Sequence, residues 1–120
     1  MDFSVTVTSH GRWEILRVGG EIDMATAPRF RQRLRAVIDT GAHHVVIDLS
    51  EVDFIDSTGL GVLLGAVKRV RGEGGDIRLV TTGTRLTGLI EITRLDRMLD
   101  VFDTVAAAVA DPGDAGEPER

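Results

Sequence analysis

The segment that most constrains the fold is residues 45–71, VVIDLSEVDFIDSTGLGVLLGAVKRVR. Its first five residues are mostly apolar and β-branched, which predicts a strand buried on both faces. Residues 50–56 predict a turn, and a helix then begins at Asp56 or Ser57 and ends at the glycines after Arg71. The predicted inner face of this helix has helical spacing and consists of Leu60, Leu63, Leu64 and Val67.

Another face of this helix carries a line of four residues, three of which are small. At about 100° per residue, this line contains Ser57, Gly61, Gly65 and Lys68. Each glycine inside a helix costs about 1 kcal/mol relative to alanine, which indicates that something approaches the backbone closely. Two interpretations stay open. A neighbouring helix of the same domain packs there, or a partner protein docks there with Ser57 at one end.

Composition narrows the class of protein. The chain has 120 residues and no cysteine, which fits one domain and excludes a disulfide framework, a thiolate nucleophile and a thiolate metal site. The net charge of −5 argues against nucleic acid and anionic membranes as partners. No apolar run is long enough to span a membrane, and the first residues lack a signal-peptide pattern. We therefore expect a cytoplasmic protein.

The N-terminal third predicts a hairpin and a helix. Residues 3–8 and 13–18 have strand patterns, and Gly19-Gly20 ends the second strand. Thr26 is the predicted N-cap of a helix that runs to about Asp39. Its outer surface carries Arg29, Arg31, Arg33 and Arg35. Such a basic set is most often a solvated face, with nucleic-acid contact as the minority interpretation.

The remaining segments continue the alternation of strands and helices. Strands are predicted at residues 76–81 and 98–102, with helices capped by Thr84 and Asp103. The element order is β-β-α-β-α-β-α-β-α, which predicts an α/β fold with a small mixed β-sheet and about four helices. We expect residues 1–110 to form this domain and residues 111–120 to be a disordered tail.

Catalytic and cofactor motifs fail in detail. A dinucleotide fingerprint begins at Gly59-Leu60-Gly61, but Leu64 occupies the position of its third glycine. A nucleophile elbow around Ser57 would need glycine in place of Ile55, and all three histidines precede the serine. The adjacent pair His43-His44 lacks further ligands and predicts a wet turn. We expect neither an enzyme nor a cofactor or metal site.

The segment VIDLSEVDFIDSTGLGVLL, residues 46–64, resembles the signature of STAS-domain anti-sigma factor antagonists. Gly20-Glu21-Ile22-Asp23, followed by the helix after Thr26, resembles a second hallmark of that family, and the resemblance covers residues 3–110. It implies the small STAS α/β domain. It also implies that Ser57 is the phosphoacceptor, with the neighbouring hydroxyl of Thr58 as the second choice.

The resemblance also implies partners and a switch. Unphosphorylated antagonists of this family bind an anti-sigma factor that is also a serine kinase, which frees a sigma factor. Phosphorylation ends the binding, and a serine phosphatase resets the antagonist. The expected partner-binding residues are Asp23, Asp56, Ser57, Thr58, Gly61, Gly65 and Lys68. A phosphate at a helix N-terminus is favoured by unpaired N–H groups and the helix dipole, so it should act at the docked surface and leave the domain folded.

Two alternatives stay open. One is a STAS scaffold or signalling domain with a different partner, and the other is a small nucleotide-binding or hydrolytic protein. If Ser57 had no such role, its hydroxyl would be a plain N-cap.

Overall fold

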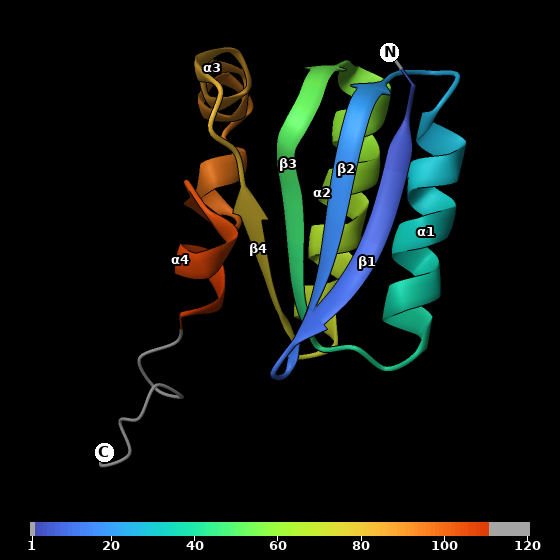
Figure 1. The fold of residues 1–120 in the computed structure, drawn as a ribbon, viewed down its shortest axis with the longest axis vertical. Coiled ribbons are helices and arrows are strands. Elements are labelled where there is room, and N and C mark those ends of the chain that lie inside the picture. Colours follow the sequence, from blue (N-terminus) through green and yellow to red (C-terminus); the bar gives the residue numbers. More distant parts are fainter. Residues whose placement is uncertain (1, 111–120) are drawn as a thin grey trace.

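The structure is a computed structural model that describes residues 2–110; the side chains of Thr84, Arg85 and Thr87 are not part of that description. The predicted tail therefore lies outside the described residues. The strands are β1 (Ser4–His10), β2 (Trp13–Ile22), β3 (His44–Ile55), β4 (Asp76–Val80) and β5 (Asp100–Phe102). The helices are α1 (Ala27–Asp39), α2 (Ser57–Gly72), α3 (Thr84–Thr93) and α4 (Val105–Val109), and a 3-10 turn, η1 (Leu95–Arg97), precedes β5 (Figure 1).

The strands form one mixed sheet. Its order is β1-β2-β3-β4-β5, with β1 antiparallel to β2 and each later neighbour parallel to the one before it. A helix connects each pair of parallel strands, as such crossovers require. The predicted α/β class, the mixed sheet and the order of elements are confirmed.

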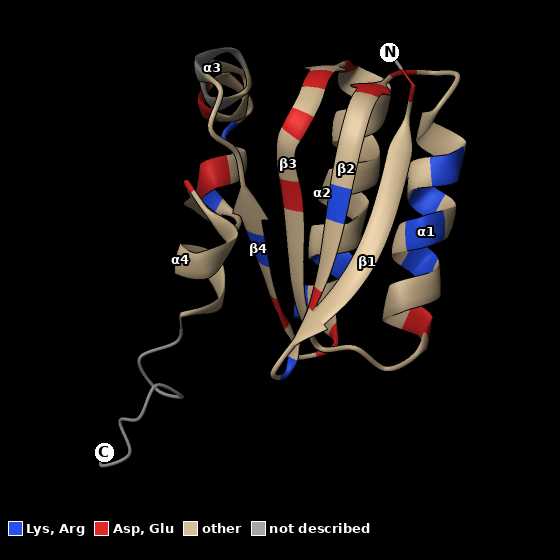
Figure 2. Cartoon of the chain, viewed as in Figure 1, with Lys and Arg blue, Asp and Glu red and all other residues tan. Residues whose placement is uncertain are grey.

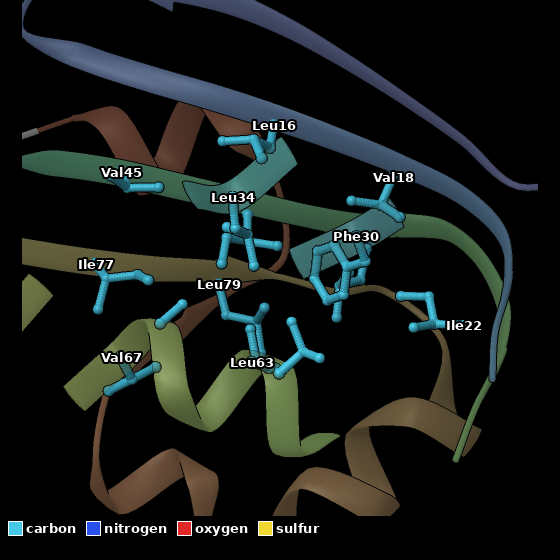
Figure 3. Close-up of a cluster of buried hydrophobic side chains, with 14 of the residues drawn as sticks. Leu16, Val18, Ile22, Phe30, Leu34, Val45, Leu63, Val67, Ile77 and Leu79 are labelled. Atoms are coloured by element: carbon cyan, nitrogen blue, oxygen red, sulfur yellow. The ribbon is translucent and has the colours of Figure 1, made fainter. Parts of the chain in front are cut away.

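The main core lies between the sheet and helices α1 and α2 (Figure 3). Phe30 and Leu34 of α1 and Leu63 and Val67 of α2 are almost fully buried there. They meet the inward residues of the central strands, which are Leu16, Val18, Ile22, Val45, Ile47, Ile77 and Leu79. The short helix α3 adds Leu86 and Ile90 to the same core.

A smaller cluster on the opposite face of the sheet is covered by α4. The guanidinium of Arg78 lies 4.4 Å from the ring centroid of Trp13 and 5.6 Å from that of Phe102. It also donates a hydrogen bond of 2.7 Å to the carbonyl oxygen of Ala108 in α4. His44 contacts the edge of Trp13 with ring centroids 5.3 Å apart, so it belongs to β3 and not to the predicted wet turn.

Strands β2 and β3 are both longer than predicted. The register between them shifts beyond Arg17 and again beyond Gly20, which indicates bulges that absorb extra residues of β3. The carboxylate of Asp48 holds the first irregularity, because it accepts hydrogen bonds from the backbone N–H and the hydroxyl of Ser50. The predictions that residues 50–56 form a turn and that Gly19-Gly20 ends a strand are therefore wrong.

Gly20 has a specific role inside β2. Its φ is +89°, and an added Cβ would lie 2.2 Å from the carbonyl oxygen of Asp2. A side chain is excluded here on both grounds, since few L-residues adopt this conformation and the N-terminal segment occupies the space. The glycine therefore lets the chain before β1 pass close to β2.

Three predicted caps need correction. Thr26 is the N-cap residue of α1, but its hydroxyl donates to the carbonyl oxygen of Glu21 instead of capping the helix. Helix α3 begins at Thr84 with Gly83 in the N-cap position. In α4 the cap is Thr104, whose hydroxyl accepts from the N–H of Ala107 at 3.1 Å, and not Asp103.

Candidate functional site

The ends of β2 and β3 position the start of α2. Ile22 and Ile55 are paired residues at these ends, and the N–H of Asp56 donates to the carbonyl oxygen of Ile22 at 3.0 Å. Asp23 and Asp56 therefore follow neighbouring strand ends at the same edge of the sheet. Figure 2 shows acidic residues gathered along this end of β2 and β3.

Asp56 is the N-cap of α2, and the hydroxyl of the next residue takes no part in capping. Its Oδ1 accepts hydrogen bonds from the N–H groups of Thr58 at 2.9 Å and Gly59 at 3.0 Å. The side chain of Ser57 is exposed, and its hydroxyl makes no hydrogen bond within the described part of the chain. Ser57 is therefore not a plain N-cap.

This cap also changes the expected electrostatics. Two N–H groups at the start of α2 already bind the carboxylate of Asp56, so they are not the unpaired donors expected for an anion on Ser57. The helix dipole still favours negative charge at this end. The carboxylate of Asp56 opposes a second anion beside it.

Asp23 has a structural partner set of its own. Its Oδ1 accepts from the N–H groups of Ala25 at 2.9 Å and Thr26 at 3.1 Å. These bonds form a tight turn between β2 and α1, as carboxylate side chains commonly do. The negative charge of Asp23 is thereby held at the edge of the sheet where α2 begins.

Gly59 is a residue that the sequence did not single out as structural. An added Cβ would lie 2.6 Å from Cγ2 of Ile22 and 2.8 Å from Cγ1 of Ile55. The first turn of α2 therefore rests directly on the ends of the two strands. The lack of a side chain at Gly59 therefore sets how close the first turn of α2, which includes Ser57, lies to the two strand ends.

The small residues of α2 face outward. Gly61, Gly65 and Lys68 are exposed, as is Ser57, and within residues 2–110 no other element lies within 4 Å of a Cβ added at either glycine. The interpretation in which another helix of the same domain packs on this stripe is therefore wrong. Because Gly59 and Gly61 lie inside the helix and not in a loop, they do not form a dinucleotide cradle.

The inner face of α2 is rotated relative to the prediction. Leu63 and Val67 are buried as expected, but Leu60 and Leu64 are only half-buried. The remaining buried positions of the helix are Gly59, Val62, Ala66 and Val70. Val62 and Ala66 lie on the side of α2 that faces α1, whereas the two leucines lie on another side.

Leu60 and Leu64 instead line a pocket of about 320 Å³ beside the serine. The pocket lies between α2 and the segment that follows α3, and its other lining residues are Ser57, Gly61, Thr93, Leu95 and Met98. Sequence reasoning missed this apolar surface. The leucine spacing was visible, but it indicated the core instead of the site.

Neither a metal-binding cluster nor a membrane-spanning helix is found within residues 2–110. These residues contain no cluster of three or more histidine, aspartate or glutamate side chains suited to hold a metal ion. Among them, no helix has both the length and the apolar character needed to cross a bilayer.

The fold and the site together define a small α/β domain. At one edge of its sheet this domain exposes a serine hydroxyl and a helix face without large side chains. The STAS domain model matches residues 4–108, and the chain belongs to the STAS domain family. The resemblance expected from the sequence is confirmed.

Relatives that match most of the chain are named anti-sigma factor antagonists. The Anti-sigma-B factor antagonist of Bacillus subtilis (strain 168) is 36% identical over 101 residues, which cover 84% of this chain and 92% of that protein. The Anti-sigma-B factor antagonist of Staphylococcus epidermidis is 29% identical over 101 residues, 84% of this chain and 94% of that protein. The crystal structure of an anti-sigma factor antagonist from Mycobacterium paratuberculosis is similar with a TM-score of 0.83 and 33% identity, covering 89% of this chain and 91% of that one.

Proposed function

We propose that this chain is an anti-sigma factor antagonist, a regulatory protein without catalytic activity that is switched by phosphorylation of Ser57. In the unphosphorylated state it binds an anti-sigma factor that is also a serine kinase, and a sigma factor is released. The observation that carries this proposal is the exposed hydroxyl of Ser57. Asp56 caps the helix, so this hydroxyl is not needed as a cap. The names of the relatives that match most of the chain support it.

Thr58 is the weaker candidate for the acceptor. Its side chain is half-buried, whereas that of Ser57 is exposed. A kinase needs access to the hydroxyl and to the backbone around it, which favours the more exposed residue. The partner surface would consist of Asp23, Asp56, Ser57 and Thr58 with the stripe of Gly61, Gly65 and Lys68.

Phosphorylation would act at this surface by charge and bulk. A phosphate adds a charge of about −1.5 to −2. Asp56 precedes the serine, and Asp23 lies at the same edge of the sheet, so the new charge joins an acidic region. A partner seated on the smooth face of α2 would then meet a bulky anion that must be desolvated on binding. A serine phosphatase would restore the binding state.

The test is incubation of the full chain with ATP and the anti-sigma factor kinase that co-purifies with it from its native host. We expect one phosphate, on Ser57, and weaker binding of the phosphorylated chain to the kinase. Ser57→Ala should block phosphorylation and keep binding, because the hydroxyl is small. Ser57→Glu should weaken binding less than phosphate does, since a carboxylate has less charge and fewer acceptor oxygens.

Thr58→Ala is the matched control and should still accept phosphate. A phosphopeptide that places the phosphate on Thr58 would show that the acceptor is assigned wrongly. Unchanged affinity of the phosphorylated chain for its partner would remove the switch itself.

A further inference from the structure

A surface on the other flank of α2, where this helix packs beside α1, shares Gly61 and Gly65 with the stripe. The two helices enclose a groove of about 330 Å³ that does not include Ser57. Its lining comes from four residues of α1 and five of α2: Arg31, Leu34, Arg35, Ile38, Gly61, Val62, Gly65, Ala66 and Arg69.

The floor of the groove is apolar and smooth. Leu34, Ile38, Val62 and Ala66 are each at most 8% exposed, so their side chains close the floor without projecting from it. Gly61 and Gly65 lie one helical turn apart beside them, with open space where their side chains would be. An incoming backbone can therefore approach α2 closely at these two positions, because neither glycine has a side chain.

The rim of the groove is positively charged. Arg31 and Arg35 are one turn apart on the α1 side, both are exposed, and neither side chain forms an ion pair or hydrogen bond within residues 2–110. Figure 2 shows the basic residues gathered on α1. None of the described residues that line the groove is acidic, although the chain as a whole has a net charge of −5.

The α2 side of the rim is held in place by carboxylates. Arg69 donates to Asp39 at the end of α1 at 2.7 Å and to Glu73 at 3.2 Å. The hydrogen bonds that the Arg69 guanidinium donates to Asp39 and to Glu73 raise its pKa. The resulting contact ties the C-terminal ends of the two helices together at one end of the groove. Among the described lining residues, the guanidinium groups without an ion pair are therefore those of Arg31 and Arg35.

We propose that this groove binds an acidic amphipathic α-helix of a partner protein. Its small apolar side chains would pack on the floor, and carboxylates on its flank would pair with Arg31 and Arg35. Helices that lie in a groove commonly bind in this way, with apolar anchors one and two turns apart. A nucleic-acid backbone would satisfy the arginines but leave the apolar floor unfilled, and it would approach a chain of net negative charge.

This inference goes beyond the proposed switch, and its test uses neither the kinase nor phosphorylation. The probe is a synthetic helical peptide with alanine and leucine along one face and glutamate on both flanks. A second peptide has lysine in place of every glutamate. Calorimetric titration of the full chain at low ionic strength should show that the glutamate peptide binds at least about tenfold more tightly than the lysine peptide, because the rim is positive. Added salt should weaken this binding.

Matched charge reversals on α1 locate the site. Arg31→Glu with Arg35→Glu should weaken binding of the glutamate peptide by about tenfold or more, since each reversal converts attraction into repulsion. Arg29→Glu with Arg33→Glu makes the same charge change on the flank of α1 that faces β1, and it should alter the affinity by less than about threefold. Gly65→Arg should abolish binding, and Ser57→Ala should leave it unchanged. Circular dichroism confirms that each variant is folded.

Three results would overturn the proposal. One is equal loss in the two double variants, which would mean that only overall charge matters. Another is no binding of the glutamate peptide up to about 1 mM, an affinity of only about 4 kcal/mol. The third is duplex DNA that binds more tightly than the peptide and depends on Arg31 and Arg35. None of these results affects the phosphorylation test, and an unphosphorylated Ser57 does not affect the titration.

Discussion

Asp56 and Ser57 are neighbours at the start of α2, and only one of them is engaged by the helix. The carboxylate of Asp56 accepts the N–H groups of Thr58 and Gly59, whereas the hydroxyl of Ser57 is exposed and has no hydrogen-bond partner within residues 2–110. The division means that Asp56 supports the helix and that Ser57 is available for chemistry. A change at one residue should therefore affect stability, and a change at the other should not.

The first prediction tests this division. Asp56→Ala should lower the free energy of unfolding by about 0.5–2 kcal/mol, because two N–H groups lose their acceptor. Asp56→Asn should cost less, since the amide oxygen still accepts. Ser57→Ala is the control and should stay within about 0.5 kcal/mol of the original chain. Urea denaturation followed by circular dichroism measures all three, and a Ser57→Ala loss equal to that of Asp56→Ala would contradict the assignment.

The second prediction compares two glycines of the same helix. Gly59→Ala should destabilise the chain by about 1–3 kcal/mol, because its Cβ would overlap Ile22 and Ile55. Gly65→Ala should instead stabilise it by about 0.5–1 kcal/mol, because the position is open and alanine favours the helix. Thermal unfolding of both variants gives the signs directly. If the two variants shifted the unfolding temperature in the same direction, the assignment of Gly59 to the buried side and Gly65 to the exposed stripe would be wrong.

The third prediction concerns the faces of α2. Leu63→Ala should cost about 2–5 kcal/mol, because the side chain is fully buried between α2 and the sheet. Lys68→Ala should cost at most about 0.5 kcal/mol, since the residue is exposed. Comparable denaturation midpoints for the two variants would show that these faces are assigned wrongly.

The fourth prediction addresses the attachment of α4. Arg78→Lys keeps the charge but loses the planar guanidinium that stacks on Trp13 and donates to Ala108. We expect it to increase amide hydrogen exchange in α4 while the amides of β2 and β3 stay protected. Arg97→Lys is the same substitution on the exposed turn η1. It should change hydrogen exchange neither in α4 nor in β2 and β3. Uniform exchange across the chain in the Arg78 variant would show instead that the whole domain depends on this contact.

Periodicity predicted the order of elements because strands and helices of this chain have clear apolar patterns. It failed where pairing between distant segments decides the outcome. The polar residues Ser50 and Glu51 predicted a turn, yet they continue β3 because Asp48 and the bulges opposite Gly19 accommodate them. No local pattern indicates a bulge whose partner strand lies some thirty residues earlier.

The site was predicted in part for a similar reason. Aspartate and serine are both good N-cap residues, so the sequence left the start of α2 open between Asp56 and Ser57. The glycine spacing correctly placed a smooth stripe on one face, but it did not say whether that face was covered. Burial of Leu60 and Leu64 was predicted from their helical spacing, whereas Val62 and Ala66, which lie beside Leu34 and Ile38 of α1, are the buried residues.

Trp13 has a practical consequence that follows from its place beneath α4. It is the only tryptophan of a chain without tyrosine, so near-ultraviolet fluorescence emission of the protein comes almost entirely from this one indole ring. The ring lies at the start of β2, and Ser57 follows the far end of the parallel strand β3. The emission spectrum of Trp13 should therefore report the detachment of α4 from the sheet. It should not respond to a group attached to Ser57, because the length of the sheet separates the two residues.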